Sequence, residues 1–293
     1  MCNIALEAHT LNISRAAQIL STSQVWDLLQ RTFVQRALLV AVLVSLCTAL
    51  LGVNLVLKRY AMIGDGLSHV AFGTLSVAFA MGWSPLYVAL PMVLAAAFLL
   101  LRLSESSHIK GDAAIALISS ASLAVGVIAV DRAGGFNPEV QGYLFGSLIG
   151  SITREDVMLT IAVTVLVLAV YVVCYHKFFA VTFDESFARA TGTRTRVYNT
   201  LLALLTALVI VIGMRTAGAM LISSFIVFPA LTAMRLLRSF RGVVLGAVAS
   251  AVLGAVIGVV ASLFLDTPTG ATIVVVNLLL FLLASGVRKI RLR

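Results

Sequence analysis

Long apolar stretches alternate with short polar ones along almost the whole chain. Each apolar stretch approaches the roughly 20 residues that an α-helix needs to cross the core of a bilayer. The predicted spans are residues 37–57, 62–82, 84–101, 113–130, 157–176, 197–214, 216–237, 242–264 and 269–287. Segment 140–150 is too short to cross, and it is predicted to form a re-entrant or interfacial helix. The pattern therefore predicts an all-α, polytopic integral membrane protein with about eight or nine transmembrane helices.

The composition agrees with a membrane domain and argues against a water-soluble fold. Of the 293 residues, 61% are hydrophobic and only 11% are charged, whereas a soluble domain has roughly a quarter charged residues. Residues 1–36 are mixed polar and apolar, and they lack the order of a cleavable signal peptide. We therefore divide the chain into a polar N-terminal extension, 1–36, whose role and side stay open, and a transmembrane domain, 37–293.

Positive charge marks one side of the predicted helix bundle. The formal net charge is +9, but the basic residues form short clusters between spans, without the interleaved aromatic residues of a nucleic-acid surface. The clusters are Lys58/Arg59, Arg102/Lys110, Lys177 with Arg189, Arg194 and Arg196, then Arg235/Arg238/Arg241, and Arg288/Lys289/Arg291/Arg293. Nine spans place all of these clusters on one side, which the positive-inside rule makes cytoplasmic. The C-terminus is then cytoplasmic, and no nucleic-acid partner is expected.

Asp65 and His69 are the candidate metal ligands of the predicted spans. Asp65 is the one acidic residue inside a span, and His69 follows it at a spacing of one helical turn. This spacing puts a carboxylate and an imidazole on one face of a helix, where both can bind one divalent transition metal ion. A carboxylate inside the membrane is costly, which points to a function. Alternatively, Asp65 pairs with Lys58 or Arg59 near the interface, and a neighbouring helix satisfies His69.

The polar segment 183–196, FDESFARATGTRTR, is predicted to begin with a short amphipathic helix. Asp184 can cap the start of this helix, Ala188 favours helix, and Gly192 can supply the left-handed residue that ends it. The segment is cytoplasmic in the topology given above. It is either a solvated connection or a helix that docks on a cytoplasmic partner.

Sequence motifs of several enzyme classes are missing. The chain contains no GxxxxGK[ST] phosphate loop, no HExxH and no GxSxG. These absences exclude ATP binding in the P-loop manner and the commonest zinc-protease and serine-hydrolase classes. The cysteines, Cys2, Cys47 and Cys174, are too far apart for a CxxC site. A transport role whose energy comes from elsewhere remains.

Two sets of small or polar residues are interpreted as packing features. The glycines Gly242, Gly246, Gly254 and Gly258 allow the close approach of another helix, either within the chain or across a dimer. Asn54 and Asn277 are typical of hydrogen bonds between helices, so we do not count them as metal ligands.

The segment Lys58–His69, KRYAMIGDGLSH, resembles the permease family of bacterial zinc and manganese ABC importers, of the ABC-3 type. In that family the second helix begins with a basic pair and continues with Ile/Phe-Gly-Asp-x-Leu-x-His. Three further stretches agree in order and spacing: YLFGSLIGSITREDV at 143–157, FDESFARATG at 183–192 and RTAGAMLISSFIVFPALTA at 215–233. The resemblance covers residues 37–288, whereas the polar N-terminus departs from the short start of the family.

The resemblance implies a type II importer permease in the bacterial inner membrane, and not an enzyme. ATP hydrolysis would take place on a dimer of cytoplasmic ATPase subunits. The resemblance also implies a second permease copy, or a related permease, and an extracytoplasmic metal-binding protein. Zinc, manganese or iron would be the transported substrate, with no tightly bound cofactor.

The same resemblance implies roles for three groups of residues. Asp65 and His69 match the metal-coordinating pair of the family. Asp184, Glu185, Ala188 and Gly192 match its coupling helix, which enters a cleft in the ATPase. Arg215, Gly218 and Pro229 match positions with a structural or gating role, since Pro229 permits a kink in a moving helix.

Three other functions remain as alternatives. A secondary transporter driven by an ion gradient would use Asp65 as a proton-titrating carboxylate. A membrane enzyme would use Asp65 and His69 as an acid/base or metal pair. An ABC permease for a metal chelate would share the architecture without needing this pair.

Overall fold

The structure is a computed structural model that describes residues 30–104, 111–136, 138–146, 152–219 and 221–291. Within these ranges the chain is helical and contains no strand. The helices are α3 (Thr32–Leu57), α4 (Ala61–Ala80), α5 (Pro85–Ser104), α6 (Gly111–Arg132), α7 (Pro138–Phe145), α8 (Arg154–Phe183), α9 (Glu185–Ala190), α10 (Thr195–Ala217), α11 (Ile222–Leu236), α12 (Phe240–Leu265) and α13 (Thr269–Arg291). The predicted all-α fold is confirmed for this part of the chain.

Each of the nine predicted spans coincides with a helix. Within the described ranges, seven helices are long and apolar enough to cross a membrane, namely α3, α5, α6, α8, α10, α12 and α13. Helix α11 is apolar but has 15 residues, and α4 has 20 residues but includes Asp65 and His69, which lower its hydropathy. The short segment predicted at 140–150 overlaps α7, which has eight residues.

The first helix begins at Thr32, earlier than the predicted start of the first span at residue 37. Val34 and Ala37 are both buried, so apolar packing extends α3 beyond the predicted boundary. Residues 1–29 of the predicted N-terminal extension lie outside the described part, and its role stays open.

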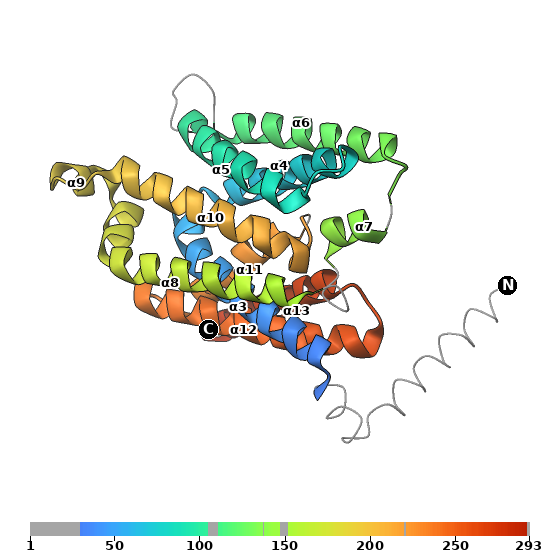
Figure 1. Cartoon of the computed structure of the whole chain (residues 1–293). Helices are drawn as coiled ribbons and strands as arrows, with labels where there is room; N and C mark the ends of the chain where they lie inside the picture. Colours follow the sequence, from blue (N-terminus) through green and yellow to red (C-terminus); the bar gives the residue numbers. More distant parts are fainter. Residues whose placement is uncertain (1–29, 105–110, 137, 147–151, 220, 292–293) are drawn as a thin grey trace.

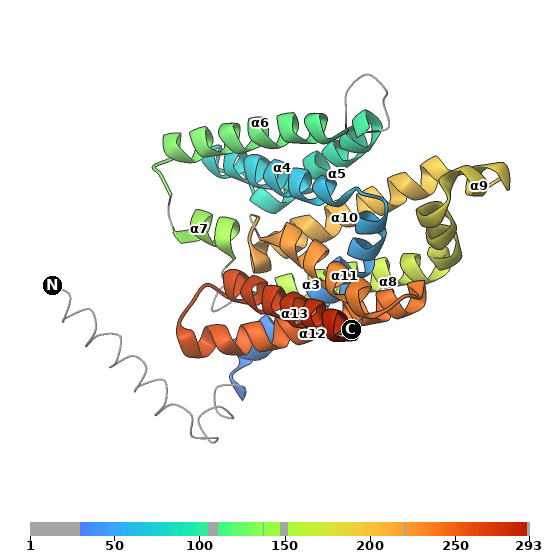
Figure 2. The same ribbon diagram turned by 180° about the vertical axis from the view of Figure 1, so that it is seen from behind.

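The helices form three layers in space. Figures 1 and 2 show α4, α5 and α6 on one side and α3, α8, α12 and α13 on the other, with α10 and α11 between them. Helices α3 and α10 are buried over most of their length. The outer helices expose large apolar side chains such as Leu117, Val173 and Leu283. A surface of this kind is stable in lipid and not in water.

The two ends of the bundle differ. Helix α9 lies at one end, and α7 lies at the opposite end (Figure 1). The end of α3 reaches α9 through an ion pair of Lys58 with Glu185, and the start of α12 reaches the end of α8 through the rings of Phe240 and Phe183. Three predicted basic clusters therefore share the α9 end, as the topology requires. The assignment of that end to the cytoplasm stays a prediction.

Several glycines pack helices together within the chain. A Cβ atom on Gly254 would lie 2.2 Å from the Asn277 side chain of α13, and one on Gly258 would lie 2.5 Å from Ile273. Asn54 donates to Tyr171 of α8 at 3.0 Å and accepts from Thr182 at 3.0 Å. The packing interpretation of these glycines and of Asn54 is confirmed.

Candidate metal site and coupling segment

Helix α4 is enclosed by neighbours that approach its glycines. A Cβ atom on Gly66 would lie 2.8 Å from Ile115 of α6, and one on Gly73 would lie 2.5 Å from the carbonyl oxygen of Ser122. Gly66 and Gly73 leave no room for a side chain between α4 and α6, so this face of α4 must be turned toward α6. The contacts therefore fix the rotation of α4 about its axis. The polar side chains of α4 are therefore held on a defined face.

Asp65 and His69 share a face of α4, as the spacing predicts. The Nε2 atom of His69 lies 3.6 Å from Oδ2 of Asp65, and the two side chains are 18% and 37% exposed, respectively. The hydroxyl group of Ser223, at the start of α11, also interacts with the Asp65 carboxylate. The pair is thus neither sealed in the core nor spread over an open surface, and an ion can reach both side chains.

The alternative in which Lys58 neutralises Asp65 is not what the structure shows. The Lys58 ammonium group lies 3.2 Å from the Glu185 carboxylate of α9 and also donates to Asn199. The Lys58 side chain thus binds residues at the α9 end of the molecule. His69, in turn, keeps its Nδ1 atom buried without a hydrogen-bond partner in the described part of the chain.

The part of the chain that the structure describes supplies an incomplete set of metal ligands. Among the described residues, no group of three or more His, Cys, Asp or Glu side chains could hold a metal ion. Zn²⁺ usually takes four ligands, and Mn²⁺ takes more. An ion at Asp65 and His69 therefore needs further ligands from water, from hydroxyl groups such as that of Ser223, or from a second protein chain.

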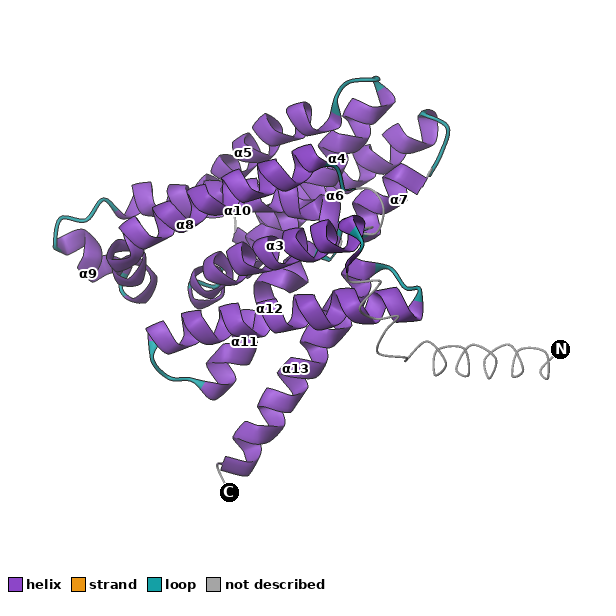
Figure 3. Ribbon diagram, turned by 60° about the horizontal axis from the view of Figure 1, so that its bottom comes forward, coloured by secondary structure: helices purple, strands orange, loops and turns teal. Residues whose placement is uncertain are grey.

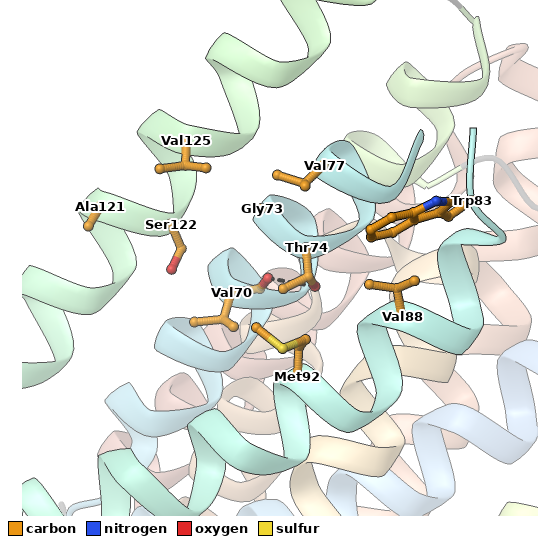
Figure 4. Close-up of a pocket in the computed structure, with 10 residues that line it drawn as sticks. All are labelled: Val70, Gly73, Thr74, Val77, Trp83, Val88, Met92, Ala121, Ser122 and Val125. Atoms are coloured by element: carbon orange, nitrogen blue, oxygen red, sulfur yellow. Dashed lines mark hydrogen bonds between the residues drawn. The ribbon is translucent and has the colours of Figure 1, made fainter. Parts of the chain in front are cut away.

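A separate cavity of about 430 Å³ lies against a different face of α4, between α5 and α6 (Figure 4). Its lining comprises Val70, Gly73, Thr74, Val77, Trp83, Val88, Met92, Ala121, Ser122 and Val125. The Thr74 hydroxyl group is bonded to the Val70 carbonyl oxygen of its own helix at 2.9 Å. The cavity offers no carboxylate or imidazole, so it is not the metal site.

The predicted helix of the segment 183–196 is present as α9. The Asp184 carboxylate accepts a hydrogen bond from the Phe187 amide at 2.8 Å and so caps the helix start. Ala188 is buried, and Gly192 has a φ of +85°, the left-handed conformation expected at the end of a helix. Figure 3 shows loops on both sides of α9, between the end of α8 and the start of α10.

The two sides of α9 differ in what they contact. Phe187 is 65% exposed, and Phe183, just before the helix, is 60% exposed. Glu185 instead points toward α3 and α10, where it binds Lys58 and Asn199. The sequence pattern does not reveal Lys58 and Asn199 as partners of Glu185, because they are distant along the chain and Lys58 fits one of the basic topology clusters.

Glu185 is held in its charged form. Partial burial would by itself raise the pKa of this carboxyl group, but the Lys58 ammonium and the amide of Asn199 outweigh burial, and the pKa is lowered from its ordinary value of 4.5. Glu185 therefore carries a full negative charge at neutral pH.

Gly218 lies at the break between α10 and α11, at the opposite end from α9. Its φ of +84° is open to glycine and strained for other residues, and a Cβ atom there would lie 2.4 Å from the Gly146 nitrogen. The Ala219 amide next to it donates to the Tyr143 carbonyl oxygen of α7 at 2.8 Å. The backbone at Gly218 thus packs directly against α7, while the structural or gating role of this residue stays a prediction.

The other two residues predicted to act in gating are placed less fully. Pro229 is buried inside α11, where it cannot donate a backbone hydrogen bond to the preceding turn. Arg215 belongs to the last part of α10, and its side chain lies outside the described part of the structure. The gating role of both residues stays a prediction.

Known proteins resemble the chain over most of its length. It is 30% identical to the "Probable iron transport system membrane protein" of Haemophilus influenzae, covering 90% of this chain and 97% of that protein. It is 29% identical to the "Manganese transport system membrane protein MntC" of Halalkalibacterium halodurans, covering 88% of each. It is 28% identical to the "High-affinity zinc uptake system membrane protein ZnuB" of Haemophilus influenzae, covering 85% of this chain and 95% of that one.

A solved structure shares the fold. The chain superposes on a chain of "PsaBC from Streptococcus pneumoniae in complex with Fab" with a TM-score of 0.81 and 26% identity, covering 89% of this chain and 94% of that one. Residues 30–288 match the family model described as "ABC 3 transport family", which is far more than half of the chain. The chain therefore belongs to the ABC 3 transport family.

Proposed function

We propose that this chain is the membrane permease subunit of an ABC importer that carries a divalent transition metal into the bacterial cytoplasm. The observation that carries the proposal is the Asp65–His69 pair, which is partly exposed on one face of a helix inside the membrane domain. Relatives described as iron, manganese and zinc transport proteins support it. Carboxylate and imidazole ligands suit all three ions, so the pair favours a transition metal without selecting one.

In this proposal two permease copies face each other, and each contributes Asp65 and His69. Four protein ligands would then surround one ion, a number that the described part of one chain does not bring together. An extracytoplasmic binding protein delivers the metal. ATP is hydrolysed on two cytoplasmic ATPase subunits, which act on the permease through α9. The metal is the substrate, so its ligands must hold it weakly enough to release it.

The test is uptake of radiolabelled zinc and manganese into vesicles that contain this chain and its ATPase. We expect ATP-dependent uptake that is lost in His69→Ala and in Asp65→Asn. Thr74→Ala is the matched control, because Thr74 also lies on α4 but faces the apolar cavity. We expect it to transport like the wild type.

Other outcomes would favour other functions. Uptake that follows an ion gradient and ignores ATP would replace the importer with a secondary transporter. ATP-dependent uptake of a metal chelate that survives His69→Ala would show that the pair does not contact the substrate. Thermal unfolding of each purified variant in detergent separates loss of function from loss of the fold.

A further inference from the structure

A buried polar cluster joins α9 to two other helices. The Lys58 side chain is 6% exposed, and its ammonium group lies 3.2 Å from the Glu185 carboxylate, which is 33% exposed. The Asn199 amide donates to both oxygens of Glu185 at 3.3 Å, and its carbonyl oxygen accepts from Lys58. The three side chains thus form a closed ring of contacts among the end of α3, the start of α9 and the start of α10.

This ring resists separation of its members. A buried ammonium group that loses its carboxylate keeps an uncompensated charge, which is far more costly than the loss of an exposed ion pair. Arg189 also lies 3.3 Å from Glu185, but its side chain is 72% exposed, so this second pair is screened by solvent. The contact with Lys58 is therefore the stronger attachment of α9 to the transmembrane bundle.

Lys58 is also tightly connected to the helix that holds the metal pair. Residues 58–60 alone separate α3 from α4. Backbone hydrogen bonds close this break, from Tyr60 to the Leu55 carbonyl oxygen at 2.8 Å and from Lys58 to the Asn54 carbonyl oxygen at 3.0 Å. Arg59 adopts a left-handed φ of +61° there. A short break fixed in this way cannot absorb a displacement of Lys58, so the displacement reaches the start of α4 and Asp65 in its second turn.

We propose that Lys58 is the positioning residue through which movement of α9 is transmitted to the Asp65–His69 site, by way of its contacts with Glu185 and Asn199. This inference rests on the proposed function, because it assigns a route between the ATPase contact and the metal pair. It also separates two roles within α9. Phe187 presents the outer face to a partner, and Glu185 holds the inner face to the bundle.

The experiment measures metal uptake and ATP hydrolysis in the same vesicles, with the full complex of permease and ATPase. For Lys58→Met and Glu185→Gln we expect ATP hydrolysis to continue while the number of metal ions carried per ATP falls about fivefold or more, the lower end of coupling between sites. Mn²⁺ titration of the purified permease should give wild-type binding, since the metal pair is intact. The double variant Lys58→Glu/Glu185→Lys restores the ion pair and should recover much of the ratio.

Thr182→Val is the matched control. Thr182 donates a hydrogen bond to Asn54, which lies one turn before Lys58 on α3. The substitution therefore removes a polar contact between α8 and α3 without changing a contact of α9. We expect its transport ratio to stay at the wild-type value. If Lys58→Met transports like the wild type, or if Thr182→Val lowers the ratio equally, the inference is wrong.

Two further results are informative. If Lys58→Met does not fold, the double variant Lys58→Glu/Glu185→Lys tests the inference instead. A folded double variant with a low ratio of metal ions carried per ATP contradicts the inference, and a recovered ratio supports it. If the wild-type complex carries no metal with ATP, the proposed function itself fails, whatever the variants do.

Discussion

At the scale of single residues, Glu185 shows how one carboxylate can be shared by two cations in different surroundings. Lys58 approaches it from the buried side and Arg189 from the solvent side. Burial favours the neutral acid, but the charge of Lys58 and the hydrogen bonds from Asn199 prevail, so that the pKa is lowered. A carboxyl group of this kind links the stability of the folded protein to pH.

We expect this link to appear below the ordinary pKa of 4.5. The stabilising contribution of Glu185 is complete above that value and is lost as the pH falls through the lowered pKa of the folded protein. Thermal unfolding in detergent should therefore show a steeper loss of Tm on acidification for the wild type than for Glu185→Gln. The difference in Tm between the two proteins should be constant from pH 6 to 8. Parallel curves below pH 5 would contradict the assignment.

The sequence predicts some site residues and hides others for a physical reason. Asp65 and His69 are one helical turn apart, so the period of the helix alone brings them together. Lys58 and Glu185 are separated by 127 positions, and their contact depends on how three helices pack. Hydropathy and local spacing do not contain this information, and spacing alone makes Lys58 a possible partner of Asp65.

At the scale of helices, the break between α10 and α11 is a junction of three backbones. Gly218 touches the end of α7, and a Cβ atom on Gly270, at the start of α13, would lie 2.3 Å from the Ala217 carbonyl oxygen. The backbones of these segments therefore approach one another directly at the two glycines. Any displacement of one segment is therefore expected to move the others.

Gly218→Ala tests this junction. The methyl group would lie 2.4 Å from the Gly146 nitrogen, and alanine is strained at the φ of +84°. We expect a loss of about 1–3 kcal/mol in the free energy of unfolding, from the backbone strain alone. Thermal unfolding in detergent measures it.

Gly286→Ala is the control for this substitution. Gly286 lies within α13, and no atom of the described residues would lie within 4 Å of its Cβ atom. We expect a neutral or slightly stabilising effect there, because alanine favours helix by up to about 1 kcal/mol over glycine. Equal effects at the two positions would show that the junction is not tightly packed.

The helices themselves were largely predictable. Apolar runs located every span, and the positions of Asp184 and Gly192 located α9. The start of α3 at Thr32 was missed, since the polar residues Gln35 and Arg36 interrupt the apolar run there. The contacts of Gly218 were also invisible, because a glycine in a sequence does not indicate which distant backbone it meets.

At the scale of the whole molecule, the difference between the two ends of the bundle predicts which end of the protein faces the cytoplasm. In a background without the native cysteines, we expect Ser239→Cys, in the connection from α11 to α12, to react with an impermeant maleimide from the cytoplasmic side alone. Ala133→Cys, just after α6, should react from the other side. Both positions are exposed, so accessibility within the protein does not limit labelling. The reverse pattern would overturn the positive-inside assignment.

The polarity of α4 also bears on how the protein is made. An aspartate inside a span opposes insertion, and α4, with Asp65 in its second turn, is not among the helices apolar enough to cross alone. The helices that pack most extensively against α4 are α5 and α6, which are apolar enough to cross and approach it closely at Gly66 and Gly73. We expect α4 to stay in the bilayer through its packing against α5 and α6, so that the residues proposed to carry the metal depend on neighbouring helices for their very presence in the membrane.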